Sequence, residues 1–504
     1  MCQTIKERLL RILPYFLIGL IVFLAVTFAT ECSFAFRMNV WNDVNCFYTV
    51  AYAMKNGAVL YRDIYEQKGL YLYAIHILAV YMAPAGSYIG MYFIELICGF
   101  IFAYFSYKTF RLFDFSKRKA ALSTMAVVLF LYISFAFYLG DSAEELAVPM
   151  YAFSLYTLLK KAKKNEDIPY YSLVISGVLA GILFLIKFTL ISFYVGFGII
   201  YFIWKIKDKE VGQAFIAAGF FIAGFILASV PCLIYFASNG ALNDLWTVYF
   251  YDNIFFYSNR SNMNIFLQLL ASLGTYFMHT GFGWPYFVSM IFALVYVIIT
   301  KKIKGNRVFS GIIATFASIS LLMIIGRVHY SYYGIPFAIY GFTGILCLND
   351  LSIKKEKIGA FLSKFKKPIS AVSFALMAVI SFAGAPDMPE VFKREEDLVP
   401  FRFKKIIMEE ENPTILNYGF LDMGLYYICQ VPPTCKYFTG LNSVDPKIEE
   451  GQQNSIDNGL TTFVVSVNKE PMNIYNHYEL VSTEQYKIRL VDDTYYLYRL
   501  KGLH

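Results

Sequence analysis

The stretch "NVWNDVNCFYTVAYAMKNGAVLYRDIYEQKG", residues 39–69, is a polar interval in a strongly apolar chain. It combines acidic and basic side chains, whereas residues 13–30 just before it are almost all apolar. An apolar run of that length matches the hydrocarbon core of a bilayer, and in lipid it must be helical because its backbone groups bond internally. We therefore expect a membrane helix, with the polar interval outside the bilayer at its end.

The composition of the whole chain predicts the same fold class. Of its 504 residues 58% are hydrophobic, with 49 Phe and 41 Tyr. A soluble domain cannot bury that much apolar surface, so the expected fold is an α-helical polytopic membrane protein with about eleven transmembrane helices. The first run could instead be a signal peptide, but its length favours a retained helix. The spans are expected at residues 13–30, 88–107, 120–139, 145–159, 171–187, 190–204, 212–235, 284–300, 308–325, 335–349 and 369–385.

Short basic loops predict the orientation of these helices. Clusters such as 108–119 and 160–164 follow predicted spans, and Lys and Arg favour the cytoplasmic side. The N-terminus is then cytoplasmic. Two further apolar segments, 70–83 and 264–280, are interpreted as interfacial or re-entrant helices, because a full crossing would place basic loops outside. The outer loops are expected at 31–87, 140–144, 236–283 and 326–334.

Charge divides the chain into two parts. Residues 1–386 carry 32 Lys and Arg against 18 Asp and Glu, and residues 387–504 carry 12 against 18. The basic excess follows membrane orientation, so no nucleic-acid partner is expected. We predict a transmembrane domain over 1–386 and a small extracytoplasmic mixed α/β domain over 387–504. In the latter, "TTFVVSV" (461–467) predicts a strand and "YKIRLVDDTYYLYRL" (486–500) a hairpin with "VDD" at its turn.

Carboxylates gather in the expected outer loops. Asp43 follows the first helix, Glu66 lies in "YRDIYEQKG", and Asp141, Glu144 and Glu145 lie close together in "GDSAEE". Neighbouring acids repel one another, which favours a bound cation or raised pKa values. The alternative for the last group is a solvated loop tip that keeps the hairpin out of lipid.

Basic residues are scarce in the same loops, and an anionic ligand would recruit them. The candidates are Lys68, Arg260 and Arg327, with His329 close to the last of these. The alternative for Arg327 and His329 is anchoring at the membrane interface. Snorkelling is the favoured interpretation of Lys187.

Other polar residues are interpreted more simply. His76 is interpreted as structural, and Glu95, an acid inside a predicted span, either takes part in function or bonds a neighbouring helix. The 8 cysteines are scattered without metal-ligand spacing. Cys429 and Cys435 either pair in an oxidising space or stay free.

The first outer loop resembles that of a known family. An acid, then "LYRDIYEQKG" (60–69) and a short apolar helix, resemble the first-loop signature of the GT-C superfamily of membrane glycosyltransferases, in particular its protein O-mannosyltransferase and aminoarabinose-transferase branch. That branch usually has Lys-Pro-Pro before the short helix, whereas this chain has "KGL" at 68–70. The likeness continues through "GDSAEE" (140–145), "SGVLAGILFLIKFT" (176–189) and "GRVHYSYYGIP" (326–336).

The resemblance implies an inverting transfer of sugar from a polyprenyl-phosphate donor to a cell-envelope acceptor at the outer face of the membrane. Asp43 would act as the base on the acceptor nucleophile, assisted by Glu66. Cations would stabilise the negative charge on the departing phosphate. The residues that would hold this phosphate are Lys68, Arg260, Arg327 and His329.

The resemblance also implies partners and a possible metal. A divalent cation, Mg²⁺ or Mn²⁺, would bind Asp141 and Glu144 together with Asp43. The expected partners are a polyprenyl-phosphate-linked sugar, membrane lipid and a glycan, lipid or protein acceptor. The expected location is a bacterial plasma membrane.

Two other functions fit part of the sequence. A transporter or lipid flippase would explain the helices and Glu95, but its site usually lies near the bilayer midplane and not in outer loops. A non-enzymatic cell-envelope scaffold would not need a polar first loop. The transferase interpretation accounts for both the helices and the loop.

Overall fold

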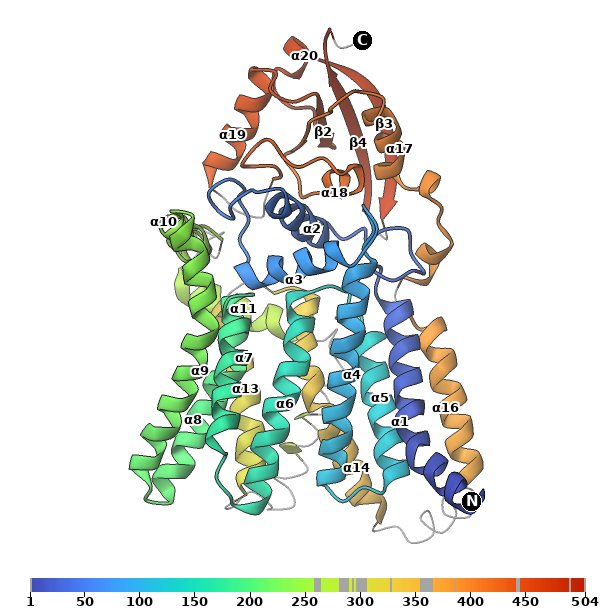
Figure 1. Ribbon diagram of the computed structural model, residues 1–504, viewed down its shortest axis with the longest axis vertical. Helices are drawn as coiled ribbons and strands as arrows, with labels where there is room; N and C mark the ends of the chain where they lie inside the picture. The colour runs from blue at the N-terminus through green and yellow to red at the C-terminus, as the bar shows by residue number, and fades with distance from the viewer. Residues whose placement is uncertain are drawn as a thin grey trace.

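A bundle of long helices carries a small domain with a β-sheet at one end (Figure 1). The computed structural model describes residues 2–257, 264–280, 290–291, 294–295, 306–326, 329–353, 366–385, 387–440, 445–488 and 491–502. Helix α1 (Cys2–Ala29) begins at the end of the bundle far from the sheet (Figure 1). The first and last elements of the chain therefore lie at opposite ends of the molecule.

The bundle consists of apolar helices, as the composition predicts. Within the described ranges, five helices are long and apolar enough to cross a membrane. A sixth span results if Ser331–Tyr340 and Phe342–Asn349, bent by 44°, are counted together. Besides α1 the long elements are α4 (Ile89–Leu112), α5 (Lys117–Tyr132), α6 (Ala143–Lys164), α7 (Tyr170–Phe184), α8 (Ser192–Lys207), α9 (Val211–Ser238), α13 (Arg307–Gly326), α14 (Phe342–Ile353) and α16 (Lys366–Ala383).

This arrangement confirms the polytopic helical fold class. The number of eleven spans stays a prediction, because some predicted spans correspond to short helices: α5 has 16 residues and α7 has 15. The predicted span 284–300 lies mostly outside the described residues.

Glycines allow two of the helices to pack very closely. A Cβ added to Gly177 of α7 would lie 2.0 Å from the carbonyl oxygen of Phe221, and one added to Gly224 of α9 would lie 2.1 Å from that of Val174. Small residues at such crossings let helix backbones approach in membranes, where there is little hydrophobic driving force for association. The glycine-rich "SGVLAGILF" is therefore a packing face.

Two short helices, α2 (Asn42–Lys55) and α3 (Leu70–Tyr81), lie across the end of the bundle beneath the C-terminal domain (Figure 1). Helix α3 confirms the short helix predicted over 70–83. Helix α2 corrects the prediction that its residues form a loop. Most of its side chains are buried, because α3 covers one side and the C-terminal domain the other. Its sequence therefore lacks the polar stripe by which a surface helix is recognised.

The predicted outer loop 236–283 also contains helices. Its described part holds the π-helix η2 (Leu245–Tyr257) and α11 (Ile265–Thr280), and α11 coincides with the apolar segment predicted over 264–280. A π-helix is rare, and such segments often occur at functional sites. The remaining short elements of the helical part are η1 (Phe188–Ile191), α10 (Leu242–Asp244) and η4 (Ser331–Tyr340).

The C-terminal domain has a four-stranded mixed sheet in the order β1-β2-β4-β3. Strand β1 is parallel to β2, and the other two pairs are antiparallel. This confirms the mixed α/β character that the sequence predicts. Its strands are β1 (Ile415–Tyr418), β2 (Phe463–Val467), β3 (Tyr478–Ile488) and β4 (Val491–Leu500). Its helices are η5 (Met388–Phe392), η6 (Glu395–Asp397), α17 (Val399–Ile407), α18 (Leu425–Cys429), α19 (Pro446–Asp457) and α20 (Ile474–His477).

The predicted hairpin is present, but its turn is elsewhere. "VDD" (491–493) was expected at the turn and instead begins β4, where Asp493 pairs with Tyr486 of β3. Strand β3 also begins earlier than predicted, at Tyr478. Cross-strand packing over both long strands outweighs the local turn preference of Asp. Cys429 and Cys435 are free thiols.

The C-terminal domain is tightly joined to the helices below it. The Tyr427 hydroxyl donates to the carbonyl of Ser87 at 2.8 Å, and the Tyr65 amide donates to the carbonyl of Lys436 at 2.9 Å. One hydrophobic core runs from the bundle into the sheet. The boundary between residues 386 and 387 stays a prediction.

Candidate active site

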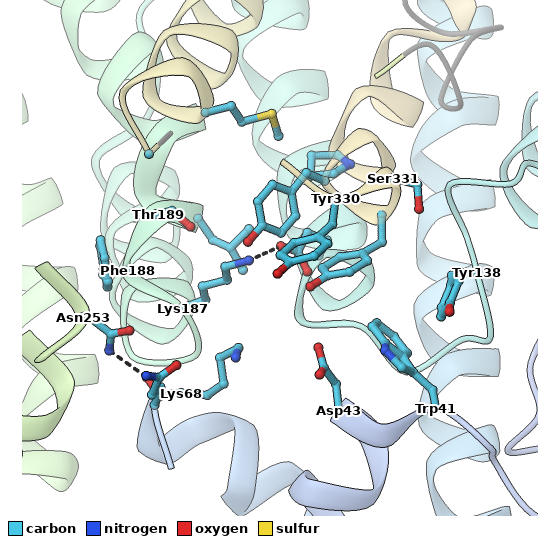
Figure 2. Close-up of a pocket in the computed structure, with 18 of the residues that line it drawn as sticks. Trp41, Asp43, Lys68, Tyr138, Lys187, Phe188, Thr189, Asn253, Tyr330 and Ser331 are labelled. Atoms are coloured by element: carbon cyan, nitrogen blue, oxygen red, sulfur yellow. Dashed lines mark hydrogen bonds and ion pairs between the residues drawn. The ribbon is translucent and has the colours of Figure 1, made fainter. Parts of the chain in front are cut away.

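A cavity of about 1170 Å³ lies where the bundle meets α2, α3 and the C-terminal domain (Figure 2). Its wall combines segments that are far apart in the sequence: the start of α2, residues 66–68, residues 184–192, η2, the end of α13, residues 330–336 and part of the sheet. The polar first loop thus lines an internal space. Four carboxylates and two ammonium groups line this cavity among the described residues, and they are Asp43, Glu66, Glu144, Asp493, Lys68 and Lys187.

Asp43 lies in the first turn of α2 and points its carboxylate into the cavity (Figure 2). The side chain makes a hydrogen bond with Tyr332. Burial raises the pKa of the Asp43 carboxyl above its ordinary value, and Lys68 and Lys187 reduce that rise. A carboxylate with a raised pKa is a stronger base, so Asp43 is suited to accept a proton inside this cavity.

Glu66 and Lys68 form a second unit in the wall of the cavity. Glu66 Oε2 accepts hydrogen bonds from the Lys68 backbone amide at 2.8 Å and from the Tyr73 hydroxyl. Its other oxygen, Oε1, lies 3.9 Å from Lys68 Nζ. Burial raises the pKa of Glu66, and Lys68 opposes that rise. These contacts hold the ammonium group in the cavity.

The π-helix also supports this unit. The Asn253 amide nitrogen donates to the carbonyl of Gln67 at 2.9 Å (Figure 2). The same nitrogen donates to the carbonyl of Tyr249 at 3.0 Å, inside η2 itself. Residues 66–68 are therefore fixed from two sides, by α3 and by η2.

Lys187 lines the cavity, although sequence analysis did not name it as a site residue. Snorkelling was the favoured interpretation, but its ammonium points into the cavity and lies 2.5 Å from Glu144 Oε1 (Figure 2). It also lies over the ring of Tyr333, 3.8 Å from the centroid, and 5.8 Å from that of Tyr332. The available sequence signal was a lone lysine inside an apolar hairpin, which is unusual unless it has a partner.

Asp141 and Glu144 do not converge, although the sequence grouped them. Glu144 lines the cavity and pairs with Lys187. Asp141 is buried behind it, where its Oδ2 lies 3.0 Å from His76 Nε2. The other ring nitrogen of His76 lies 2.8 Å from the carbonyl oxygen of Leu72. This confirms the structural interpretation of His76.

Glu95 has a structural role of the same kind. Its carboxylate accepts hydrogen bonds from the Thr30 hydroxyl at 2.8 Å and from the Asp141 amide at 2.7 Å. It therefore connects α4 to the end of α1 and to the loop before α6. Of the two alternatives that the sequence left open for Glu95, a functional role or a bond to a neighbouring helix, these contacts correspond to the second.

The donor set does not fit the expected divalent cation. No group of three or more His, Cys, Asp or Glu in the described part of the chain is arranged to hold a metal ion. Glu144 is engaged by Lys187, and Asp141 by His76. Metal dependence stays a prediction, and no step below uses a metal.

The remaining predicted phosphate ligands are not in the described wall of the cavity. Arg260 and Arg327 lie outside the described residues. His329 is described, but its Nε2 lies 2.7 Å from the Ser272 hydroxyl of α11, and it does not line the cavity. Within the part of the chain that the structure covers, the cations facing the cavity are Lys68 and Lys187.

Comparisons with known proteins agree on one fold. The family model of dolichyl-phosphate-mannose-protein mannosyltransferase matches residues 71–235. ArnT from Cupriavidus metallidurans bound to undecaprenyl phosphate aligns over 98% of this chain and 99% of its own, with a TM-score of 0.64. The apo form of the same protein aligns over 98% of each chain, with a TM-score of 0.61. Sequence identity is 12% in both cases. No curated protein sequence matches the chain.

The chain has the fold of a GT-C membrane glycosyltransferase. The resemblance read from the first outer loop is thereby confirmed. The matched segment 71–235 contains Asp141, Glu144 and Lys187, whereas Asp43 and Lys68 precede it. The likeness to ArnT extends over both parts of the cavity wall, the bundle and the C-terminal domain.

Proposed function

We propose that this protein is a membrane glycosyltransferase that moves a sugar from a polyprenyl-phosphate donor to a cell-envelope acceptor. The observation that carries the proposal is a half-buried carboxylate, Asp43, that lines one large cavity together with two ammonium groups, in a GT-C fold. A transfer of this kind needs a base for the nucleophile and cations for the leaving phosphate, and both are present in this wall.

Asp43 acts at the acceptor. Its carboxylate takes the proton from the acceptor hydroxyl or amine as that atom attacks the anomeric carbon of the sugar. The bond between the anomeric carbon and the phosphate oxygen breaks, and polyprenyl phosphate leaves with the electron pair. Attack from the side opposite the phosphate inverts the anomeric configuration.

Lys68 and Lys187 act at the phosphate. Negative charge grows on the leaving oxygen, and fixed cations in a site shielded from water stabilise it strongly. Glu66 and Glu144 each hold one of these ammonium groups in place. The carboxylates therefore orient the two ammonium groups before the donor arrives.

The apolar side of the cavity suits the lipid part of the donor. Ile254 of η2 and Ile325 of α13 line the cavity and are 50% and 51% exposed. Large exposed apolar side chains are normal where a protein faces lipid. A polyprenyl chain would leave the cavity between η2 and α13, with its phosphate near Lys68 and Lys187.

We further propose that the protein lies in a bacterial plasma membrane, with its N-terminus in the cytoplasm and the C-terminal domain outside. The basic loops support this orientation. A transporter is a weaker alternative, because Asp43 is in α2 and Lys68 directly precedes α3, and these two helices lie at the end of the bundle, next to the C-terminal domain (Figure 1). Transport sites usually lie near the midplane.

The test compares Asp43→Asn with Asp63→Asn. Asparagine keeps the size of the side chain but cannot take the proton, so the first variant should transfer about 10²–10⁴-fold more slowly. Asp63 is the matched control, since it lies between α2 and α3 and bonds Arg62 and the Val59 amide, and it does not line the cavity. We expect near wild-type transfer for Asp63→Asn.

The measurement is single-turnover transfer by the full chain in detergent, with a panel of labelled polyprenyl-phosphate sugars and cell-envelope extract as the acceptor. Monodispersity checks folding, and binding of undecaprenyl phosphate should survive in both variants. Wild-type rates in Asp43→Asn would contradict the assignment of the base. Absence of transfer by the wild-type chain from every donor would contradict the proposed function.

A further inference from the structure

The C-terminal domain contributes its own side chains to the cavity. Asp493 and Tyr495 of β4 line it, together with Leu421 from the segment after β1. Side chains two apart on a strand point to the same face, so Asp493 and Tyr495 face the cavity together. Asp492 directly precedes Asp493, is exposed, and does not line the cavity.

Strand β4 is held firmly in this position. It pairs with β3 through Asp493 and Tyr486, and with β2 through Tyr495 and Val467. The Asn468 amide nitrogen donates to Asp493 Oδ1 at 2.6 Å. Among the described residues, Asp493 Oδ2 has no hydrogen-bond partner. One oxygen is thus fixed within the domain, and the other is available to a ligand.

The negative charge of Asp493 excludes the donor phosphate as the ligand of its free oxygen. A carboxylate repels a phosphate, and the two cations suited to it come from other segments of the wall, residues 66–68 and 184–192. A carboxylate instead accepts hydrogen bonds from hydroxyl groups, or pairs with an ammonium. These are the groups of a sugar or an amine.

The place of Asp493 favours the acceptor over the donor. A donor anchored by its lipid tail enters from the bundle side, where Ile254 and Ile325 line the cavity. The acceptor must reach Asp43 from the remaining side, which the C-terminal domain forms. Tyr495 adds an aromatic ring to the cavity wall on the same face of β4.

We propose that Asp493 is a specificity-determining residue that binds a hydroxyl or ammonium group of the acceptor. This inference rests on the proposed function and adds a role for the C-terminal domain to it. The domain then completes the active site, instead of serving as a cover or an anchor.

The test uses Asp493→Asn in the full chain, with labelled polyprenyl-phosphate sugar as donor and a dilution series of cell-envelope extract as acceptor. Loss of a charge-assisted hydrogen bond should raise the extract concentration at half-maximal rate about ten-fold or more. The maximal rate, the KM for the donor and the affinity for undecaprenyl phosphate should not change.

Two control variants separate this role from a structural one. Asp492→Asn changes the adjacent carboxylate on the other face of β4 and should behave as wild type. Asn468→Ala removes the bond to Asp493 Oδ1 but leaves the carboxylate. If Asn468→Ala reproduces the whole effect, Asp493 only fixes the strand and the inference is wrong.

The remaining outcomes are also decisive. An effect of Asp493→Asn on donor KM alone would assign the residue to the transferred sugar and overturn the acceptor assignment. Unchanged kinetics in Asp493→Asn, with Asp43→Asn inactive, would overturn this inference and leave the proposed function standing. A wild-type chain that transfers no sugar would contradict the proposed function itself.

Discussion

Lys187 shows how the role of one residue depends on neighbours that are distant in sequence. Its side chain is 14% exposed and that of Glu144 is 4% exposed, so this ion pair is nearly dehydrated. Two charges in such a place stabilise each other, and removing one leaves the other buried and unpaired. The pair is therefore both a structural contact and, in our proposal, part of the phosphate site.

A set of three variants separates these two roles. Lys187→Met should lower the stability of the protein by about 3–5 kcal/mol, because it leaves Glu144 buried without its partner. Glu144→Gln together with Lys187→Met removes both charges and should recover most of that stability. Transfer should stay low in both variants, since each lacks the cation at the phosphate.

Thermal unfolding and single-turnover transfer check this prediction. Lys161→Met is the control, because Lys161 pairs with Glu166, which is 47% exposed, and surface pairs contribute about 0–1 kcal/mol. Recovery of transfer in the double variant would show that Lys187 serves stability alone.

At the scale of elements, one glycine brings the two lysines together. Gly69 precedes α3, and a Cβ added to it would lie 2.0 Å from the carbonyl oxygen of Leu185. Its amide donates to the carbonyl of Ile186 at 2.9 Å. The first loop and residues 185–186, which precede η1, are therefore in backbone contact. This contact places Lys68 and Lys187 in the wall of the same cavity. A proline here, as in the Lys-Pro-Pro of the related branch, would lack the donating amide.

Gly69→Ala should disturb this contact. The methyl group has no space, so the loop and the hairpin must separate, and overpacking of this kind costs about 1–3 kcal/mol. We expect lower thermal stability and a loss of transfer, because Lys68 and Lys187 no longer face the same ligand. Gly198→Ala is the matched control: nothing lies within 4 Å of the added atom in α8. Wild-type transfer by Gly69→Ala would show that the close approach is not needed for the site.

At the scale of the whole molecule, a buried carboxylate joins the C-terminal domain to α2. Asp422 accepts a hydrogen bond from the Thr49 hydroxyl at 2.5 Å and, on its other oxygen, from the Asn417 amide group at 2.8 Å and the Gly424 amide at 2.7 Å. Burial outweighs these bonds and raises the pKa of Asp422 from 3.8 to about 6. The folded protein therefore binds this proton more tightly than the unfolded chain does.

The stability of the protein should depend on pH through this group. A carboxyl with a raised pKa stabilises the folded state most when protonated, below pH 3.8, and this contribution is lost as the pH rises to about 6. A shift of that size corresponds to a free energy of unfolding on the order of 3 kcal/mol. Asp422→Asn removes the charge, keeps an oxygen that accepts from Asn417 and Gly424, and adds an NH2 group that can donate to the Thr49 hydroxyl oxygen. Its stability relative to wild type should therefore increase between these pH values and then level off.

Thermal unfolding in detergent from pH 4 to pH 8 checks this expectation. Asp457→Asn is the control, since Asp457 lies in the same domain and is an exposed partner of Gln453. A stability difference between Asp422→Asn and wild type that is the same at every pH would contradict the raised pKa of Asp422.

Several features of this protein follow from local sequence alone. The fold class follows because apolar runs of bilayer length have few alternatives to a membrane helix. The short helix over 70–83 and the hairpin near 486–500 follow from apolar length and strand propensity. Asp43 could also be predicted as a site residue from the sequence, because it is an acid in a polar interval that follows the first membrane span.

The tertiary structure decided how these parts form one site. Helix α2 was hidden in the sequence, because burial on two sides removes the polar stripe that marks a surface helix. Glu144 and Asp141 are close in the chain, yet Glu144 pairs with Lys187 in the wall of the cavity, whereas Asp141 is buried and pairs with His76. The partner of a buried charge comes from whichever distant segment the fold places beside it, and a local pattern carries no record of that segment.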